Sequence, residues 1–177
     1  MSSQPFIQVV NDKDEPLYGV AIEQVYRESL IHRVVYVAVI DEDGKLLLQK
    51  RGAQLLTDPG RWDISVGGHV DNDEPYEQAA LREMSEEIGL KQLTINELTH
   101  FYKEATILGK VQRRFIRVYE VRVKHDLKIN VDNREVSETK WFTIQEIKQL
   151  LLKNPEAVAV GLKHYMEQCH SFKSEMK

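Results

Sequence analysis

The sequence has a single cysteine, Cys169, which lies outside any Cys-x-x-Cys spacing. One thiol forms neither an intramolecular disulfide framework nor a thiolate zinc site. The sequence also has no apolar run near the ~18 residues that span a bilayer. Residues 1–10 lack the basic start and apolar core of a signal peptide. We therefore expect a cytoplasmic protein without a membrane partner.

Glycine and proline are scarce, at nine and five of 177 residues, and no repeat, linker or low-complexity tract occurs. Hydrophobic residues make up 42% and charged residues 29%, as in an ordinary folded domain. A chain of this length buries roughly two thirds of its surface without a covalent staple. We expect one domain over residues 1–177, with a core of about 8–152 and a C-terminal helix at 155–170.

Basic charge is not in excess, because 24 lysines and arginines face 28 aspartates and glutamates, for a formal net charge of -4. That balance repels a long polyanion in bulk, although a small anion can still bind locally. We expect a small-molecule partner and no nucleic acid.

Residue patterns predict strands alternating with a few helices. Val34 to Ile40 is rich in β-branched residues and ends at the turn signal Asp41-Glu-Asp-Gly44, so it should form a hairpin with Lys45 to Arg51. Further strands are expected at Trp62 to Val66, Leu93 to Thr106, Gln112 to Val123 and Lys140 to Phe142, with irregular loops at Gly52 to Arg61 and His125 to Glu138.

Three helices are predicted from residue 74 onward. Glu74-Pro75 suits a first helical turn, and the helical pattern runs to Glu87 before Gly89 stops it. Thr143 and Glu146 have the spacing of a capping box, so a helix should begin there. A last amphipathic helix is expected from Pro155 to about His170.

The first of these helices carries a carboxylate cluster. At 100° per residue, Glu83, Glu86 and Glu87 fall within an arc of roughly 100°, and Leu81, Met84 and Ile88 cluster on a different face. Such carboxylates repel one another by roughly 1 to 4 kcal/mol per pair at ~4 Å, a cost that a bound divalent cation removes. Ala79 and Ala80 lie on the carboxylate side and should leave room for hydrated Mg²⁺ and phosphates.

Glu-x-x-Glu-Glu by itself is usually a solvated charged face, but here it stands in a frame of 23 residues. Gly68 is followed after five residues by Glu74, after seven more by Arg82-Glu83, and then by Met84, Ser85, Glu86-Glu87, Ile88, Gly89 and Leu90. Seven fixed residues coincide by chance roughly once in 10⁸ windows or fewer. The frame resembles the Nudix box at every defined position.

The resemblance implies a role for each residue of the box. Divalent metal, Mg²⁺ or in its place Mn²⁺, would be held by Glu83, Glu86, Glu87 and the carbonyl of Gly67. Arg82 would pair with a glutamate and fix its rotamer, and Glu74 would balance the charge of the arginine. The implied reaction is hydrolysis of a diphosphate bond by metal-activated water, with Glu87, Glu86, Arg82 and a base as the catalytic set.

The base and the phosphate contact lie outside the box. The family often places a base on a late loop before a tryptophan, and Glu135 lies six residues before Trp141. Glu138, Glu120 and Glu104 are rivals, and Glu135 can instead be a further metal ligand. Arg51, at the end of its strand, is similar in position to a phosphate contact.

The histidines carry less information. His69, Trp62 and Asp63 lie close to the box in the sequence and could line the pocket. We do not include them in the predicted catalytic set. The others have no metal-ligand spacing and are expected at the surface or half-buried. They are His32, His100, His125, His164 and His170.

From Gln8 to about Leu152 the sequence resembles Nudix proteins akin to isopentenyl-diphosphate isomerase. Shared marks include His32-Arg33 before a strand, Leu47-Leu-Gln-Lys-Arg51, and Pro59-Gly-Arg-Trp-Asp63 before Gly67-Gly-His69. The resemblance implies an α+β fold, an α/β/α sandwich around a central mixed sheet. It also implies a nucleoside diphosphate-linked or similar small substrate. A homodimer is a further expectation.

Two alternatives to a hydrolase remain. Isomerase chemistry uses a cysteine where this chain reads Asp63-Ile-Ser-Val66. The isomerase pattern also lacks a complete hydrolase box, which this chain has. A non-catalytic nucleotide-binding module would be expected to lose box carboxylates, and all of them are present here.

Overall fold

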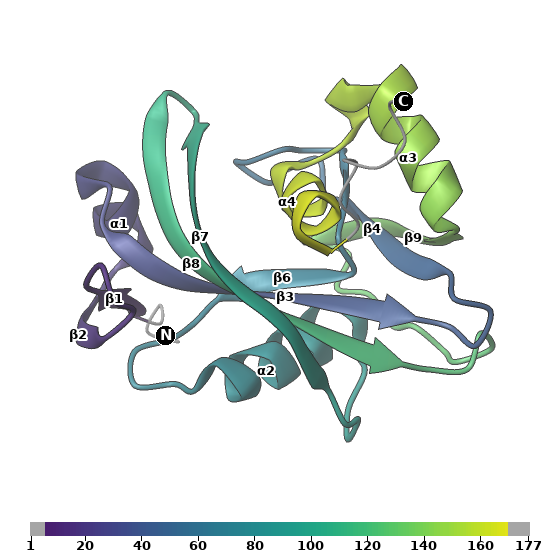
Figure 1. The fold of residues 1–177 in the computed structure, drawn as a ribbon, viewed down its shortest axis with the longest axis horizontal. Helices are drawn as coiled ribbons and strands as arrows, with labels where there is room; N and C mark the ends of the chain where they lie inside the picture. Colours follow the sequence, from purple (N-terminus) through teal and green to yellow (C-terminus); the bar gives the residue numbers. More distant parts are fainter. Residues whose placement is uncertain (1–5, 170–177) are drawn as a thin grey trace.

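The computed structural model describes residues 6–169, which form a mixed β-sheet with helices on both faces. The strands are β1 (Ile7–Val10), β2 (Pro16–Val20), β3 (Ile31–Ile40), β4 (Leu46–Arg51), β5 (Trp62–Asp63), β6 (Val66–His69), β7 (Asn96–Ile107), β8 (Lys110–Arg122) and β9 (Val136–Phe142). The helices are α1 (Ile22–Glu28), α2 (Tyr76–Ile88), α3 (Ile144–Lys153) and α4 (Val160–Cys169), with a 3₁₀ turn at Pro155–Ala157. In Figure 1, α2 covers one face of the sheet and α4 the other. The expected α/β/α sandwich with a mixed sheet is confirmed.

Strand β3 organises the sheet. It pairs in parallel with β8 along its whole length, from Ile31 opposite Arg113 to Ile40 opposite Arg122. Its other edge therefore takes β1, β6 and β4 in succession, all antiparallel. Residues 34–39 are all buried, as expected for a strand covered on both faces.

The predicted hairpin between β3 and β4 is confirmed only next to its turn. Both strands exist, but they pair only at Ile40 and Leu46, because β6 occupies the edge of β3 at residues 34–37. Strand β4 pairs instead with β9 from Leu46 to Arg51. By contrast, β7 and β8, which correspond to the two strands expected at 93–106 and 112–123, form a hairpin with Leu108 and Gly109 at positive φ, as a two-residue type I′ turn requires.

Three further predictions of element bounds are corrected. The strand expected at 62–66 is two strands, β5 and β6, and β9 begins at Val136, inside the expected loop. The last helix does not begin at Pro155. Ala159 donates its N–H to the carbonyl of Trp62 at 2.8 Å, which holds the chain extended until α4 starts at Val160. The expected end at His170 lies outside the described residues, and α1 was not predicted.

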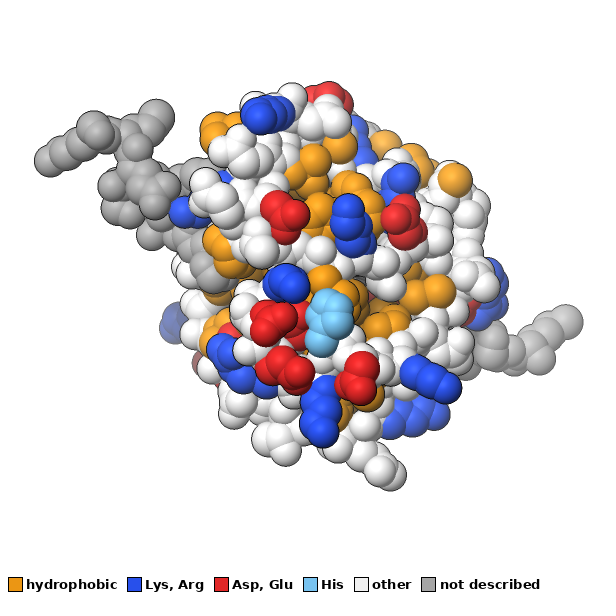
Figure 2. Space-filling model, turned by 90° about the vertical axis from the view of Figure 1, so that its right-hand side faces the viewer, with side chains coloured by type: hydrophobic (Ala, Val, Ile, Leu, Met, Phe, Trp, Pro, Cys, Tyr) orange, Lys and Arg blue, Asp and Glu red, His pale blue; other side chains and the backbone are white. Residues whose placement is uncertain are grey.

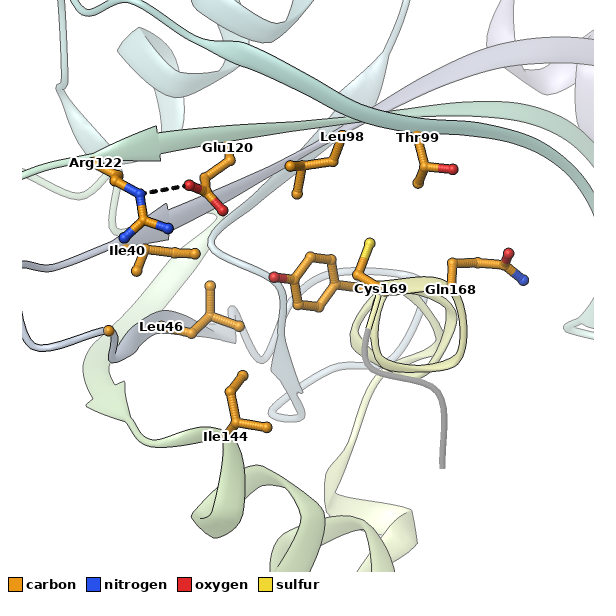
Figure 3. Close-up of a pocket in the computed structure, with 11 residues that line it drawn as sticks. Ile40, Leu46, Leu98, Thr99, Glu120, Arg122, Ile144, Gln168 and Cys169 are labelled. Carbon is orange, nitrogen blue, oxygen red and sulfur yellow. Dashed lines mark ion pairs between the residues drawn. The ribbon is translucent and has the colours of Figure 1, made fainter. Parts of the chain in front are cut away.

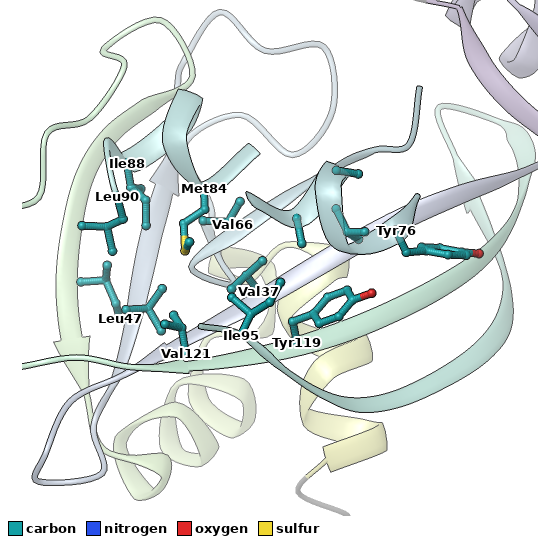
Figure 4. Packing of buried hydrophobic residues seen from close by; sticks show 14 of the residues in the cluster. Val37, Leu47, Val66, Tyr76, Met84, Ile88, Leu90, Ile95, Tyr119 and Val121 are labelled. Carbon is teal, nitrogen blue, oxygen red and sulfur yellow. The ribbon is translucent and has the colours of Figure 1, made fainter. Parts of the chain in front are cut away.

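Two hydrophobic clusters fill the spaces on either side of the sheet. On the α2 side, Met84 and Ile88 pack against Val37, Val66 and Val121 (Figure 4). On the other side, buried residues of α4, among them Leu162 and Met166, pack against alternate residues of β3 and β8. The capping box at Thr143 and Glu146 is confirmed at the start of α3.

The prediction for Ala79 and Ala80 is wrong. Both are fully buried in the cluster beneath α2. Helix α2 lies so close to β3 and β6 that its small residues pack against the sheet, and they leave no space for hydrated ions. Of the carboxylates on the same side, Glu83 and Glu87 are therefore largely buried against the sheet, and only Glu86 is exposed.

The surface shown in Figure 2, at the right of Figure 1, carries basic and acidic side chains interspersed with hydrophobic ones. That face presents no continuous basic surface to a polyanion. Within residues 6–169, no helix combines the length and the apolar character needed to cross a bilayer. The division of the chain into one domain stays a prediction.

Truncating Met84, the residue of α2 that packs into the core, should test this packing. Met84 is fully buried, so Met84→Ala should lower the free energy of unfolding by about 2–5 kcal/mol through lost contacts and a cavity. Urea denaturation measures the change. Gln78→Ala, an exposed position on the same helix, should stay within about 0.5 kcal/mol of wild type. Equal effects of the two substitutions would contradict the described orientation of α2.

Candidate active site

The site is built where β6 leads into α2. Gly68 lies directly beneath Glu83, and a Cβ on Gly68 would overlap the Glu83 carboxyl group. Helix α2 ends at Gly89, whose φ of 73° is the left-handed conformation of a common helix C-terminus. The two ends of the box thus need glycine for different reasons, one for space and one for backbone conformation.

Arg82 connects the acidic residues of the helix. It donates to both carboxylate oxygens of Glu74, each at 2.9 Å, and to Glu83 Oε1 at 2.9 Å. It also donates to Glu86 Oε2 at 3.3 Å and to the carbonyl of His69 at 3.0 Å. The fork-shaped guanidinium therefore holds α2, the turn before it and the end of β6 in one network.

Glu87 is the buried acid of the site, and Glu83 is largely buried, with 13% of its side chain accessible. Burial raises the pKa of Glu83 to about 7, against the opposing effect of Arg82. Burial also raises the pKa of Glu87 well above its usual range, and the neighbouring Glu83 adds to that rise. Gln49 Nε2 donates to Glu87 Oε2 at 2.8 Å. Glu86 is the exposed member of the three, with 61% of its side chain accessible.

The loop before β9 is attached to the end of α2 and brings Glu135 to the site. Asp132 donates its N–H to the carbonyl of Glu87 at 2.9 Å, and Glu135 donates its N–H to the carbonyl of Asp132 at 2.9 Å. Gly52 donates its N–H to the carbonyl of Glu135 at 2.7 Å. Repulsion from Glu135 contributes to the raised pKa values of both Glu83 and Glu87, so the three negative charges lie within electrostatic reach of one another.

These side chains line one cleft of about 470 Å³. Of the residues singled out from the sequence, it is lined by Arg51, Gly67, Arg82, Glu83, Glu86, Glu87 and Glu135. Glu74 does not line it and contacts the site through Arg82. The structure therefore gathers segments that are far apart in the sequence around the carboxylate helix.

The cleft offers oxygen donors of the kind that Mg²⁺ prefers. In the arrangement described for residues 6–169, no group of three or more His, Cys, Asp or Glu side chains lies close enough together to hold a metal ion. Arg82 holds Glu83 and Glu86, and Gln49 holds Glu87. Buried, mutually repelling carboxylates nevertheless fit a divalent cation by donor type and by charge.

Arg51, at the end of β4, also lines the cleft. Its guanidinium donates to the carbonyl of Thr57 and to the Thr57 hydroxyl, both at 3.0 Å, and lies 3.4 Å from Asp63 Oδ2. Asp63 also accepts the N–H of Leu162 at 2.8 Å. Through this chain of contacts, α4 on the far face of the sheet helps to position Arg51.

Several residues of the cleft were not identified from the sequence. Gln49 precedes Arg51 by two residues, the spacing that puts both side chains on one face of a strand. The sequence could therefore have predicted that Gln49 lies beside Arg51 at the site. Tyr26 lies on α1, a helix that no pattern indicated. The Tyr26 hydroxyl is 3.1 Å from His69 Nε2, and the His69 ring stacks on His32 with centroids 5.3 Å apart.

The expectation that the remaining histidines are exposed or half-buried is wrong for His32 and His164, which are buried. Burial lowers the pKa of His32 to about 3 and that of His164 to about 4, so both are neutral at pH 7. His100 and His125 keep substantial exposure. His170 lies outside the described residues.

The rival carboxylates lie away from the cleft. Glu138 is 3.8 Å from Lys50 Nζ on an exposed strand edge, and Glu104 pairs with Arg113 at 3.5 Å. Glu120 lines a separate cavity of about 530 Å³, between β8 and α4, where Arg122 pairs with it at 2.8 Å (Figure 3). That cavity is the larger of the two, but its one carboxylate is neutralised. The cleft at α2 is therefore the candidate active site.

This layered sheet, with its box helix beside the cleft, is the Nudix fold. It superposes on the crystal structure of DR0079 from Deinococcus radiodurans with a TM-score of 0.78 and 24% identity, covering 93% of this chain and 98% of that one. The model of the NUDIX domain matches residues 30–163.

The chain belongs to the Nudix family, as the resemblance of its box implied, and it is a hydrolase acting on phosphorus-containing acid anhydrides. It is 31% identical over 147 residues to the uncharacterized Nudix hydrolase YfcD of Escherichia coli K12, covering 83% of this chain and 78% of that protein. It is also 28% identical over 156 residues to isopentenyl-diphosphate Delta-isomerase 2 of Photorhabdus laumondii, covering 88% and 86%.

The raised pKa of Glu83 predicts a pH dependence of stability in EDTA. A carboxyl group with a higher pKa in the folded state stabilises the fold below its unfolded pKa of about 4.5. That contribution is lost as pH rises to about 7. The loss should be on the order of 3 kcal/mol and should be absent from Glu83→Gln. Denaturant titrations at pH 5 and pH 8 measure it, with Glu77→Gln, an exposed position on α2, as the control. An equal pH dependence in Glu83→Gln and wild type would refute the burial argument.

Proposed function

We propose that the chain hydrolyses a diphosphate bond in a small molecule, with Mg²⁺ as the cofactor and water as the nucleophile. The observation that carries the proposal is the burial of Glu83 and Glu87 side by side at the cleft, where their charges repel. Buried acids of like charge are costly unless a cation balances them. Mn²⁺ suits the same oxygen donors.

Each residue of the box has a part that follows from its contacts. Glu83, Glu86, Glu87 and the carbonyl of Gly67 would hold the metal, which when bound supplies positive charge for the diphosphate oxygens. Arg82 sets the rotamers of Glu83 and Glu86, and its paired contact with Glu74 keeps the guanidinium in place. The gap at Gly68 gives Glu83 its position under the helix.

Glu135 is proposed as the general base. It lines the cleft, and its backbone is held by Gly52 and Asp132. A carboxylate there would accept a proton from the attacking water.

Arg51 is proposed to contact a phosphate of the substrate. Its side chain is only 20% exposed and is held by Thr57 and Asp63, so little rotamer freedom would be lost on binding. A planar fork suits two phosphate oxygens at once. A nucleoside diphosphate-linked compound is the proposed substrate, and the proposed setting is the cytoplasm, with a homodimer as a further proposal.

Isomerisation of isopentenyl diphosphate is the second candidate, because one relative bears that name. The chemistry of the cleft favours it less. Ser65, in the segment where the isomerase resemblance implies a cysteine, is fully buried; its hydroxyl donates to the carbonyl of Leu47 and accepts the N–H of Val39. Cys169 lines the separate cavity of Figure 3. Neither group reaches the cleft at α2.

Removing one buried carboxylate should abolish most turnover. Glu87→Gln is expected to lower kcat/KM at least about 100-fold, more than the loss typical when a residue that only supports a metal ligand is changed. Phosphate release with Mg²⁺ is measured over a panel of nucleoside and other diphosphates, with product identification. Glu77→Gln should match wild type, since Glu77 is exposed and does not line the cleft.

The same panel separates the alternatives. Release of phosphate or a nucleotide product that Glu87→Gln loses supports the hydrolase. Conversion of isopentenyl diphosphate without phosphate release supports the isomerase, and binding without turnover supports a non-catalytic module. Unchanged turnover in Glu87→Gln overturns the assignment of the cleft.

A second substitution tests the base. Glu135→Gln should lower kcat by about 10²–10⁴-fold while Mg²⁺ affinity, measured by calorimetry, stays the same. A matching loss of Mg²⁺ affinity would make Glu135 a metal ligand instead. Glu138→Gln, exposed and outside the cleft, is the control and should keep wild-type turnover.

A further inference from the structure

A buried arginine lies beside the cleft without a carboxylate partner. Arg114, on β8, is only 9% exposed, and its Nε is buried with no hydrogen-bond partner within residues 6–169. None of the ion pairs of the described chain includes it. A buried unpaired cation costs stability, so its retention here calls for a ligand of opposite charge.

Arg114 lines two small cavities that adjoin the cleft. One, of about 100 Å³, shares Arg51, Gly67, Gly68 and His69 with the cleft. The other, of about 190 Å³, shares Leu56 and Thr57 with it and runs along the hairpin of β7 and β8. A group extending from a diphosphate bound at α2 therefore has a path to the guanidinium.

Other charges in these cavities leave Arg114 unbalanced. Asp58 pairs with Arg61 at 2.7 Å and accepts the N–H of Val160 at 3.0 Å. Asp63 pairs with Arg51 and accepts the N–H of Leu162. Both carboxylates are thus committed to other cations and to the first turn of α4.

Two residues of β8 extend the polar surface around Arg114. Gln112 precedes it by two, so the side chains lie on the same face of the strand, and Gln112 is buried at 4% exposure. Lys110 lines the same cavity and, in the chain from 6 to 169, enters no ion pair. Two unmatched cations and an amide donor suit the charge of a phosphate monoester, about −1.5 to −2 at pH 7.

We propose that Arg114, with Gln112 and Lys110, binds a phosphate monoester group carried by the substrate, separate from the diphosphate bond that is cleaved. The subsite stands on a guanidinium that has the neutral Tyr36 side chain as a hydrogen-bond partner, no carboxylate partner within residues 6–169, and a buried Nε without any partner. Its assignment to the substrate rests on the proposed hydrolysis. The substrate class is thereby narrowed to diphosphates that bear a further phosphate at a distance from the scissile bond.

Calorimetric titration with inorganic phosphate in EDTA tests the subsite. Without metal, the glutamates of α2 repel anions, and comparison with Arg114→Gln separates phosphate binding at Arg114 from binding at Arg51. Wild type should bind phosphate, and Arg114→Gln should bind at least about 10-fold more weakly, as expected for a lost charged hydrogen-bond donor. Arg113→Gln, an exposed neighbour that pairs with Glu104, should equal wild type. No binding by wild type, or equal binding by Arg114→Gln, overturns the proposal. Tighter binding of acetate than of phosphate overturns the choice of phosphate.

Two further measurements complete the test. The melting temperature of ligand-free Arg114→Gln should equal or exceed that of wild type, since a buried charge without a carboxylate partner is removed. A lower value would assign Arg114 a structural role and overturn the proposal.

With Mg²⁺, wild type should have a lower KM for coenzyme A than for dephospho-coenzyme A, or for NADP than for NAD, and Arg114→Gln should lose the preference. Phosphate binding without any turnover contradicts the proposed hydrolysis but leaves the subsite intact. Turnover without the preference contradicts the assignment of the phosphate to the substrate.

Discussion

The burial of Glu83 and Glu87 beneath α2 is the constraint on which the site depends. Two like charges removed from water raise the free energy of the folded chain unless donors or a cation offset them. Arg82 and Gln49 supply the donors, and Gly68 leaves the space that Glu83 occupies. Arg82, Gln49 and Gly68 thus each serve to accommodate Glu83 or Glu87. The negative charge of these two carboxylates also makes the cleft suitable for a divalent cation.

The cleft is held together by contacts between segments that are distant in sequence. Asp132 donates to the end of α2, and Gly52 donates to Glu135, so the late loop is attached to both α2 and the segment after β4. On the other face of the sheet, Asp63 joins Arg51 to the start of α4. Gly161 permits that approach, because a Cβ there would collide with Asp63. The wall of the cleft therefore depends on both layers of helices.

Charge is distributed unequally around this cleft. The α2 side holds an excess of carboxylates, whereas the β8 side holds Arg114 and Lys110 without acidic partners. A substrate that bridges the two sides would meet a cation-binding region at one end and an anion-binding region at the other. This polarity, more than the volume of the cavity, distinguishes the cleft from the larger space in Figure 3, where Glu120 and Arg122 neutralise each other.

The sequence by itself determined the box helix, its glycine stop, the β7–β8 hairpin and the capping box of α3, because each depends on residues within a few positions of one another. It also sufficed for the family and for the glutamates of the box. Only the tertiary structure decided that β4 pairs along its length with β9 and with β3 at one position, that Ala79 and Ala80 are core residues, and that Glu135 rather than Glu120 lies at the cleft. Those outcomes depend on which strand occupies an edge and which face of a helix meets the sheet. Both are settled by packing between distant segments, which local patterns do not encode.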